Sequence, residues 1–143
     1  MLVQLLAGSA LVTLTVATHS TVLGWMMWRL QQAPLVSRSA LSDAWLLGRI
    51  AIVCVLAHLA EITAWAMFYW WWDVMPDLEI AAYFSAVTYA TIGYGDVTPP
   101  NGWRLLAAIE GLTGILMCAW SGGFFFAMVR SLRDSRSEAR PQA

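Results

Sequence analysis

The chain has 143 residues, of which 59% are hydrophobic and 12% are charged, and its formal net charge at pH 7 is −1. A soluble domain of this size exposes much of its chain to water, and about a quarter of its residues are normally charged. The composition therefore excludes an ordinary soluble, secreted or disordered chain and indicates a membrane protein with one domain. Because the net charge provides no basic field for a polyanion, we expect no nucleic-acid partner.

The first apolar run extends from Leu2 to Trp28 and meets its first charge at Arg29. About 20 apolar residues suffice to cross the ~30 Å hydrocarbon core of a bilayer, so we assign residues 1–30 to an N-terminal transmembrane helix. A cleaved signal peptide is the alternative. It is disfavoured because the run lacks a basic start and is longer than the apolar region of a typical signal sequence.

A polar connector, residues 31–43, separates this helix from two further apolar runs. These runs predict an outer helix at 44–72 and an inner helix at 103–130. The semi-apolar piece between them, 78–90, is too short to span a bilayer, so we expect a re-entrant helix there. A polar, mobile tail is expected at 131–143.

The arginines indicate the orientation in the membrane, because seven of the eight fall on one expected side. These seven are Arg29, Arg38, Arg49, Arg130, Arg133, Arg136 and Arg140. The positive-inside rule makes their side cytoplasmic, with the N-terminus outside and the C-terminus in the cytoplasm.

The segment from Thr91 to Asp96 reads Thr-Ile-Gly-Tyr-Gly-Asp and directly follows the expected short helix. Glycines at alternate positions permit backbone conformations with positive φ. Such a strand can aim successive carbonyl oxygens to one side, where they replace the water shell of a cation. A glycine turn that caps the short helix is the alternative for the glycine pair alone.

The full hexapeptide resembles the selectivity filter of potassium channels, and residues 44–129 resemble the pore-loop channel superfamily. The chain is similar to small bacterial potassium-channel-like proteins that carry one additional helix before the pore. The stretches 58–62, 83–85 and 103–105, followed by Glu110, also resemble that group.

The resemblance implies an all-α membrane protein with three transmembrane helices, a re-entrant pore helix and a selectivity filter (91–96). The pore domain would occupy 44–130 and assemble as a homotetrameric potassium-channel pore in a bacterial inner membrane. Gly95 would complete the filter, and Asp96 would form an acidic ring at its outer mouth. Potassium would be bound by the Thr91 hydroxyl and by the carbonyl oxygens of Thr91, Ile92, Gly93 and Tyr94.

Three residues of the pore helix are expected to support the filter. Tyr83 and Phe84 stand where many relatives carry a tryptophan pair, and the Tyr83 hydroxyl is placed to reach Asp96. Val87 stands where some relatives place a carboxylate, so we expect no acid pair with Asp96. Asp77 is expected to cap the start of this helix.

The inner helix contains the candidate hinge and gate. Gly114 falls where pore-loop channels often place a hinge, and close helix packing is the alternative. Helical spacing aligns Ile115, Cys118, Gly122 and Phe126 on one stripe. If this stripe faces the pore axis, Phe126 would form a hydrophobic constriction, whereas the alternative is that it faces lipid.

Ionisable residues inside apolar helices are costly, so His58, Glu61 and Glu110 are expected to have partners. One interpretation is structural, with a glutamate accepting hydrogen bonds from the pore helix or the filter backbone. A second is a proton sensor, because histidine titrates near neutral pH. A third is a metal site formed by His58 and Glu61 together with His19.

The sequence thus predicts a potassium-selective channel that conducts K⁺ passively and is embedded in a lipid bilayer. We expect no enzymatic activity and no organic cofactor, because the chain shows no nucleophile–base pair and no phosphate-binding loop. Two alternatives stay open. One is a non-conducting or accessory membrane subunit that keeps the pore fold, and the other is a proton-sensing pore gated through His58, Glu61 and Glu110.

Overall fold

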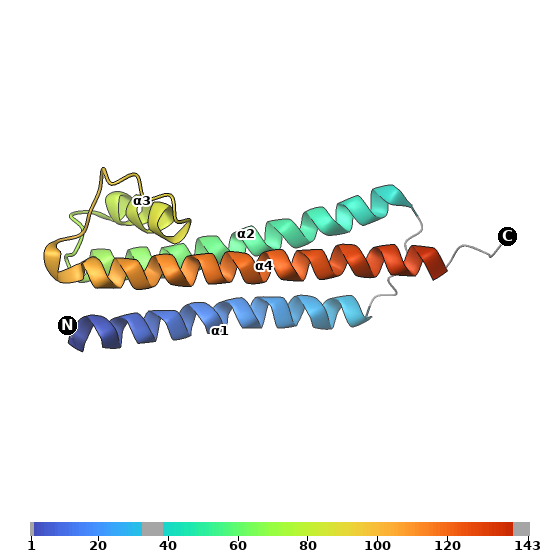
Figure 1. Ribbon diagram of the computed structural model, residues 1–143, viewed down its shortest axis with the longest axis horizontal. Coiled ribbons are helices and arrows are strands. Elements are labelled where there is room, and N and C mark those ends of the chain that lie inside the picture. Colours follow the sequence, from blue (N-terminus) through green and yellow to red (C-terminus); the bar gives the residue numbers. More distant parts are fainter. Residues whose placement is uncertain (1, 33–38, 139–143) are drawn as a thin grey trace.

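The computed structural model describes residues 2–32 and 39–138 of the chain. Three long helices run beside one another, and a shorter helix lies against one end of them (Figure 1). In chain order the elements are α1 (Leu2–Gln32), α2 (Ala40–Trp71), α3 (Leu78–Tyr89), the 3-10 turn η1 (Asn101–Trp103) and α4 (Arg104–Glu138). No strand occurs within these two described ranges, and the predicted all-α fold is confirmed.

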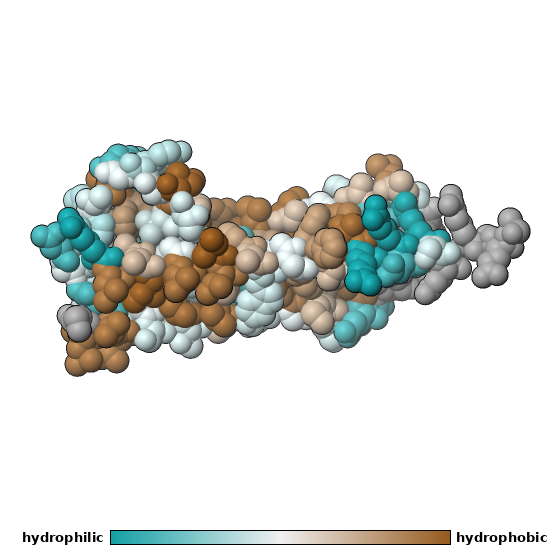
Figure 2. Space-filling model, viewed as in Figure 1, coloured by the Kyte–Doolittle hydropathy of each residue, from teal (hydrophilic) through white to brown (hydrophobic). Residues whose placement is uncertain are grey.

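The three long helices, α1, α2 and α4, are each long and apolar enough to cross a membrane, as predicted. Hydrophobic side chains cover much of the length of the bundle, and hydrophilic ones gather toward its ends (Figure 2). With 12 residues, α3 is too short to span a bilayer. It packs instead against α2 and α4, at the end of the bundle where α1 begins (Figure 1).

The two long helices that flank α3, which are α2 and α4, extend further than the hydropathy predicts. The outer helix begins at Ala40 rather than at residue 44, because the Ser39 side chain caps it by accepting a hydrogen bond from the Ser42 amide at 3.2 Å. Residues 33–38 of the connector, with Arg38, lie outside the described residues.

The predicted polar tail is helical over its first part, which corrects the expectation of a mobile segment. Helix α4 continues to Glu138 because neither glycine nor proline interrupts it after residue 130. Leu132 is buried, and Arg136 forms an ion pair with Asp43 of α2 at 2.5 Å. Residues 139–143, with Arg140, lie outside the described part of the chain.

Two apolar clusters hold the bundle together along its length. The cluster near α3 includes Leu11 of α1, Trp65 and Tyr69 of α2, Tyr89 of α3 and Leu106 of α4. The cluster at the opposite end joins Leu23, Met26, Ile50, Cys54 and Met128. Because all three long helices contribute to both clusters, α1 is packed into the bundle rather than loosely attached.

The start of α3 is fixed by its cap, as predicted. The Asp77 side chain accepts a hydrogen bond from the Ile80 amide at 2.8 Å, and Glu79 lies in the first turn. A carboxylate at this end of a helix satisfies an otherwise unpaired amide and interacts favourably with the helix dipole. The cap therefore fixes where the short helix begins.

Candidate functional site

The segment that follows α3 has an alternating backbone conformation. Thr91, Gly93 and Gly95 have positive φ values of 58°, 54° and 79°. Residues other than glycine rarely adopt this region, and a β-branched residue there is an outlier. Glycine at two of the three positions relieves this cost, whereas Thr91 holds a strained conformation. The glycines predicted to shape the segment thus lie where their backbone freedom is used.

Hydrogen bonds tether the first half of this segment to the end of α3. The amide of Thr91 donates to the Thr88 carbonyl at 2.9 Å, and the amides of Ile92 and Gly93 donate to the Val87 carbonyl at 2.8 and 3.1 Å. In a trans peptide the N–H and the preceding C=O point in opposite directions. The carbonyls of Thr91 and Ile92, which precede the second and third of these amides, therefore point away from α3.

The side chains beside these carbonyls are open to the surroundings in the single chain. Ile92 is 53% exposed and Tyr94 is 70% exposed. A row of carbonyl oxygens on a side left open by the described residues is able to replace part of the water shell of a cation. A single chain supplies only one such row and can therefore surround a cation from one side only.

The outer end of the segment is held by a hydrogen bond between Tyr83 and Asp96. The Tyr83 hydroxyl donates to Asp96 Oδ2 at 2.7 Å, which confirms the predicted contact. This bond lowers the pKa of Asp96 and raises the pKa of Tyr83. Asp96 therefore keeps its negative charge into more acidic solution than a free aspartate would.

The other two predicted supporting residues pack on the inner side of α3. Phe84 is buried, and its ring meets the ring of Tyr69 edge to face with centroids 5.2 Å apart. Val87 is also buried, and its carbonyl accepts two of the tethering hydrogen bonds described above. Val87 thus contributes through its backbone as well as through its apolar side chain.

Glu110 of α4 links α4 to α3 and α2 through buried hydrogen bonds. Its carboxylate accepts hydrogen bonds from the hydroxyls of Ser85 on α3 and Tyr69 on α2, the latter at 2.8 Å, and all three side chains are buried. Ser85 also contacts the Ile62 carbonyl at 3.0 Å. Glu110 thus accepts a hydrogen bond from the short helix, which is the contact that the structural interpretation expects.

A second buried polar cluster surrounds Glu61 and joins all four helices. His19 Nδ1 of α1 lies 2.9 Å from Glu61 Oε1, and Tyr89 of α3 donates its hydroxyl proton to Glu61 Oε2. His58 Nδ1 lies 3.2 Å from the Tyr89 hydroxyl and 3.4 Å from Glu61 Oε2. Ser121 Oγ of α4 lies 3.1 Å from the Nε2 atoms of both histidines.

The two clusters correct the grouping of His58, Glu61 and Glu110 in one polar network. Glu110 has its own partners, whereas His19, His58 and Glu61 come together as the metal-site alternative expected. Tyr89 and Ser121 were missed altogether, although a polar side chain in an apolar helix is a signal that it has a buried partner.

The residues of the candidate gate lie on the open side of α4. Cys118, Gly122 and Phe126 are exposed in the single chain, and Phe126 is 70% exposed. This arrangement is compatible with both a pore-facing and a lipid-facing stripe. Gly114 differs from them, because it lies in contact with the backbone of Tyr89.

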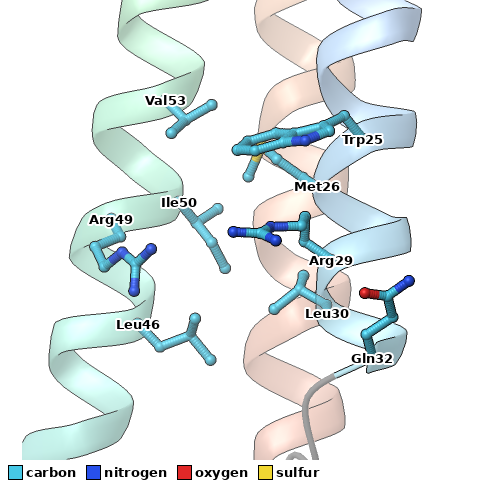
Figure 3. A pocket seen from close by; sticks show the side chains of 9 residues that line it. All are labelled: Trp25, Met26, Arg29, Leu30, Gln32, Leu46, Arg49, Ile50 and Val53. Atoms are coloured by element: carbon cyan, nitrogen blue, oxygen red, sulfur yellow. The ribbon is translucent and has the colours of Figure 1, made fainter.

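A separate pocket opens between α1 and α2 at the end of the bundle away from α3 (Figure 3). Its volume is about 440 Å³, and Arg29 and Arg49 line it together with apolar side chains. The Arg29 guanidinium lies 5.8 Å from the centroid of the Trp25 ring, a cation–π contact. None of the residues in the segment 91–96 lines this pocket.

Comparison with known proteins agrees with the geometry of the segment after α3. A family model described as "Ion channel" matches residues 53–131, which cover most of α2, all of α3 and most of α4. Helix α1 lies outside the matched range. No solved structure matches the chain.

One curated relative has a local similarity to the chain. Protein LctB of Bacillus caldotenax is 43% identical over 47 residues, an alignment that covers 33% of this chain and 35% of that protein. The chain thus spans about a third of the length of the relative that it matches.

Proposed function

The chain belongs to the ion channel family, and on that premise we propose that it is one subunit of a potassium-selective channel that conducts K⁺ passively down its electrochemical gradient. The observation that carries this proposal is the alternating backbone of Thr91, Gly93 and Gly95. Together with the tether to α3, it directs neighbouring carbonyls away from α3, to the side where the described residues leave Ile92 and Tyr94 exposed.

The proposed ion ligands are the carbonyl oxygens of four successive residues and one hydroxyl. Carbonyl oxygens that replace the hydration shell of a cation bind and release the ion without altering it chemically. This suits a transport role rather than catalysis. The ligands are the carbonyls of Thr91, Ile92, Gly93 and Tyr94 and the hydroxyl of Thr91. Gly95 completes the filter, and Asp96 attracts cations to its mouth.

We further propose that four copies surround one pore. A single chain presents one row of carbonyls, and a closed coordination shell needs rows from several sides. Four-fold cyclic symmetry closes such a ring and also covers the exposed Ile92 and Tyr94 side chains. The proposed setting is a bacterial inner membrane, with the arginine-rich ends of the helices in the cytoplasm.

A flux measurement with the purified protein in liposomes tests this proposal. We expect uptake driven by a K⁺ gradient and no uptake when Na⁺ is the only cation. Uptake that persists in Na⁺ alone would contradict potassium selectivity. Absence of flux at any voltage or pH would favour the accessory-subunit alternative.

A pair of glycine variants makes the measurement specific for the filter. Gly93 has a φ of 54°, so Gly93→Ala places a side chain on a strained backbone although the space beside it is open. We expect this variant to lose K⁺ flux. The matched control is Gly48→Ala on α2, which also has open space but an ordinary helical backbone, and should conduct as the wild type does.

A further inference from the structure

The buried cluster around Glu61 has the composition of a metal site. One nitrogen from each of two histidines, His19 and His58, and a carboxylate oxygen of Glu61 lie within 4.8 Å of one another. We propose that these three side chains bind one divalent transition-metal ion of the Zn²⁺ type in each subunit. This site is separate from the proposed filter and does not depend on which ion the pore conducts.

The choice of donors indicates the class of ion. Imidazole nitrogens suit Zn²⁺, Ni²⁺ and Cu²⁺, whereas Ca²⁺ and Mg²⁺ prefer shells of oxygen atoms. His58 and Glu61 lie three residues apart, so they project from the same face of α2. His19 approaches from α1, which brings the nitrogen and oxygen donors together from two helices.

The Nδ1 atoms of both histidines face the Glu61 carboxylate and are the proposed ligands. His19 Nδ1 lies 2.9 Å from Oε1, and His58 Nδ1 lies 3.4 Å from Oε2. The Tyr89 hydroxyl, 3.2 Å from His58 Nδ1, is placed to supply a fourth oxygen. Two nitrogens and two oxygens form a ligand set that four-coordinate Zn²⁺ accepts.

The number of hydrogens available for the hydrogen bonds of the Glu61 cluster favours a bound cation. Five contacts link the cluster: His19 to Glu61, Glu61 to Tyr89, Tyr89 to His58, and Ser121 to each histidine. Each needs one hydrogen. An ionised Glu61, two neutral histidines, one tyrosine and one serine supply only four. These side chains therefore lack one hydrogen for the five contacts.

A metal ion on the two Nδ1 atoms removes this shortage. Each neutral histidine then carries its hydrogen on Nε2, and both Nε2–H groups donate to Ser121 Oγ, which has two lone pairs. The observed position of Ser121, 3.1 Å from both Nε2 atoms, fits this arrangement. Metal-bound histidines commonly donate their other N–H to such an outer partner.

The proposed site would connect α1 to the pore. His19 lies on the helix outside the matched channel range, and Tyr89 is the last residue of α3, two residues before Thr91. An ion held between them would fasten the additional helix to the base of the proposed filter. Helix α1 would thus help to hold α3 in place.

The experiment is a Co²⁺ titration of the purified full-length protein, with d–d absorbance as the readout and Zn²⁺ as the competitor. We expect one Co²⁺ per chain, the intense visible bands of a four-coordinate site, and their loss when Zn²⁺ is added. His19→Gln and His58→Gln should each abolish these bands. Ser121→Ala should weaken binding by about 10–100-fold, since it removes the outer partner of both histidines.

Tyr69→Phe is the matched control, because it removes a buried hydroxyl from the Glu110 cluster and should leave Co²⁺ binding unchanged. A wild-type protein that binds no Co²⁺ or Zn²⁺ stoichiometrically overturns the proposal, whether or not the variants fold. Histidine NMR signals of an imidazolium would then show that a protonated histidine supplies the missing hydrogen. Metal binding without K⁺ flux would contradict only the proposed channel function. K⁺ flux without metal binding would contradict only the proposed metal site.

Discussion

The carbonyl oxygen of Tyr89 lies directly against Gly114, so that a Cβ atom at position 114 would approach it to 2.1 Å. The last residue of α3 thus rests on the backbone of α4, just before the segment that carries the proposed ion ligands. Glycine at this place permits the two helices to touch. Close packing therefore accounts for Gly114, and a hinge at the same residue stays a prediction.

Gly114→Ala is expected to destabilise the protein by about 3 kcal/mol or more, because the added methyl group meets a backbone atom and forces α3 away from α4. Thermal unfolding of the purified protein in detergent measures this loss. Gly24→Ala on α1 is the control, since nothing lies within 4 Å of its added Cβ. Equal unfolding temperatures for the two variants would show that the contact with Tyr89 is dispensable.

The pH dependence of flux should report on the hydrogen bond between Tyr83 and Asp96. This bond lowers the pKa of Asp96, so its contribution to stability is present above the ordinary aspartate pKa and is lost as the pH falls through the lowered value. In Tyr83→Phe the pKa of Asp96 should return toward its ordinary range. The acid midpoint of K⁺ flux, measured against external pH, should then shift to higher pH.

Asp96→Asn provides the control for this pH prediction. Because asparagine does not titrate, the acid transition assigned to Asp96 should disappear from this variant, with or without Tyr83→Phe. A transition with the same midpoint in the wild type, Tyr83→Phe and Asp96→Asn would show that another group titrates in this range.

The long helices and the segment after α3 could be predicted because their signals are local. Each span is a continuous apolar run, and the cap at Asp77 lies next to the helix that it starts. The extension of α4 was missed because all of residues 131–138 except Leu132 are polar. Their helix is stabilised by contacts such as that between Arg136 and the distant Asp43.

Apart from the alternative that joined His19 to His58 and Glu61, the partners within the buried clusters could not be predicted, because they come together only when the helices pack. His19 and Glu61 are 42 residues apart in the chain, and Ser121 lies 63 residues from His58 and 102 from His19. Hydropathy identifies each as an unusual polar residue. It does not indicate which helix faces which, so Glu110 could not be separated from His58 and Glu61.

Removal of the Glu110 carboxylate should weaken the attachment of α3 to the bundle. Glu110→Ala removes the acceptor of the buried Tyr69 hydroxyl, whereas the Ser85 hydroxyl keeps the Ile62 carbonyl at 3.0 Å. An unsatisfied buried hydroxyl typically costs about 1–3 kcal/mol. Denaturant unfolding should show this loss. The additional change Tyr69→Phe should recover part of it, because it removes the unsatisfied hydroxyl.

The exposed-residue control for this series is Glu79→Ala, because Glu79 is exposed in the first turn of α3, where a carboxylate interacts favourably with the helix dipole. Its expected effect is a few tenths of a kcal/mol, up to about 1 kcal/mol. If Glu110→Ala costs no more than Glu79→Ala, then the buried carboxylate does not brace the short helix.

Phe126 provides the test of the gate. Its side chain is 70% exposed in the single chain, on the same stripe of α4 as Cys118 and Gly122. If this stripe faces the axis of the proposed tetramer, four phenylalanines narrow the pore and gate it by excluding water. Phe126→Ala should then raise the open probability in single-channel recordings. Leu59→Ala, at an exposed apolar residue of the outer helix α2, should leave it unchanged. Equal open probabilities in the wild type and both variants would assign Phe126 to the lipid-facing surface instead.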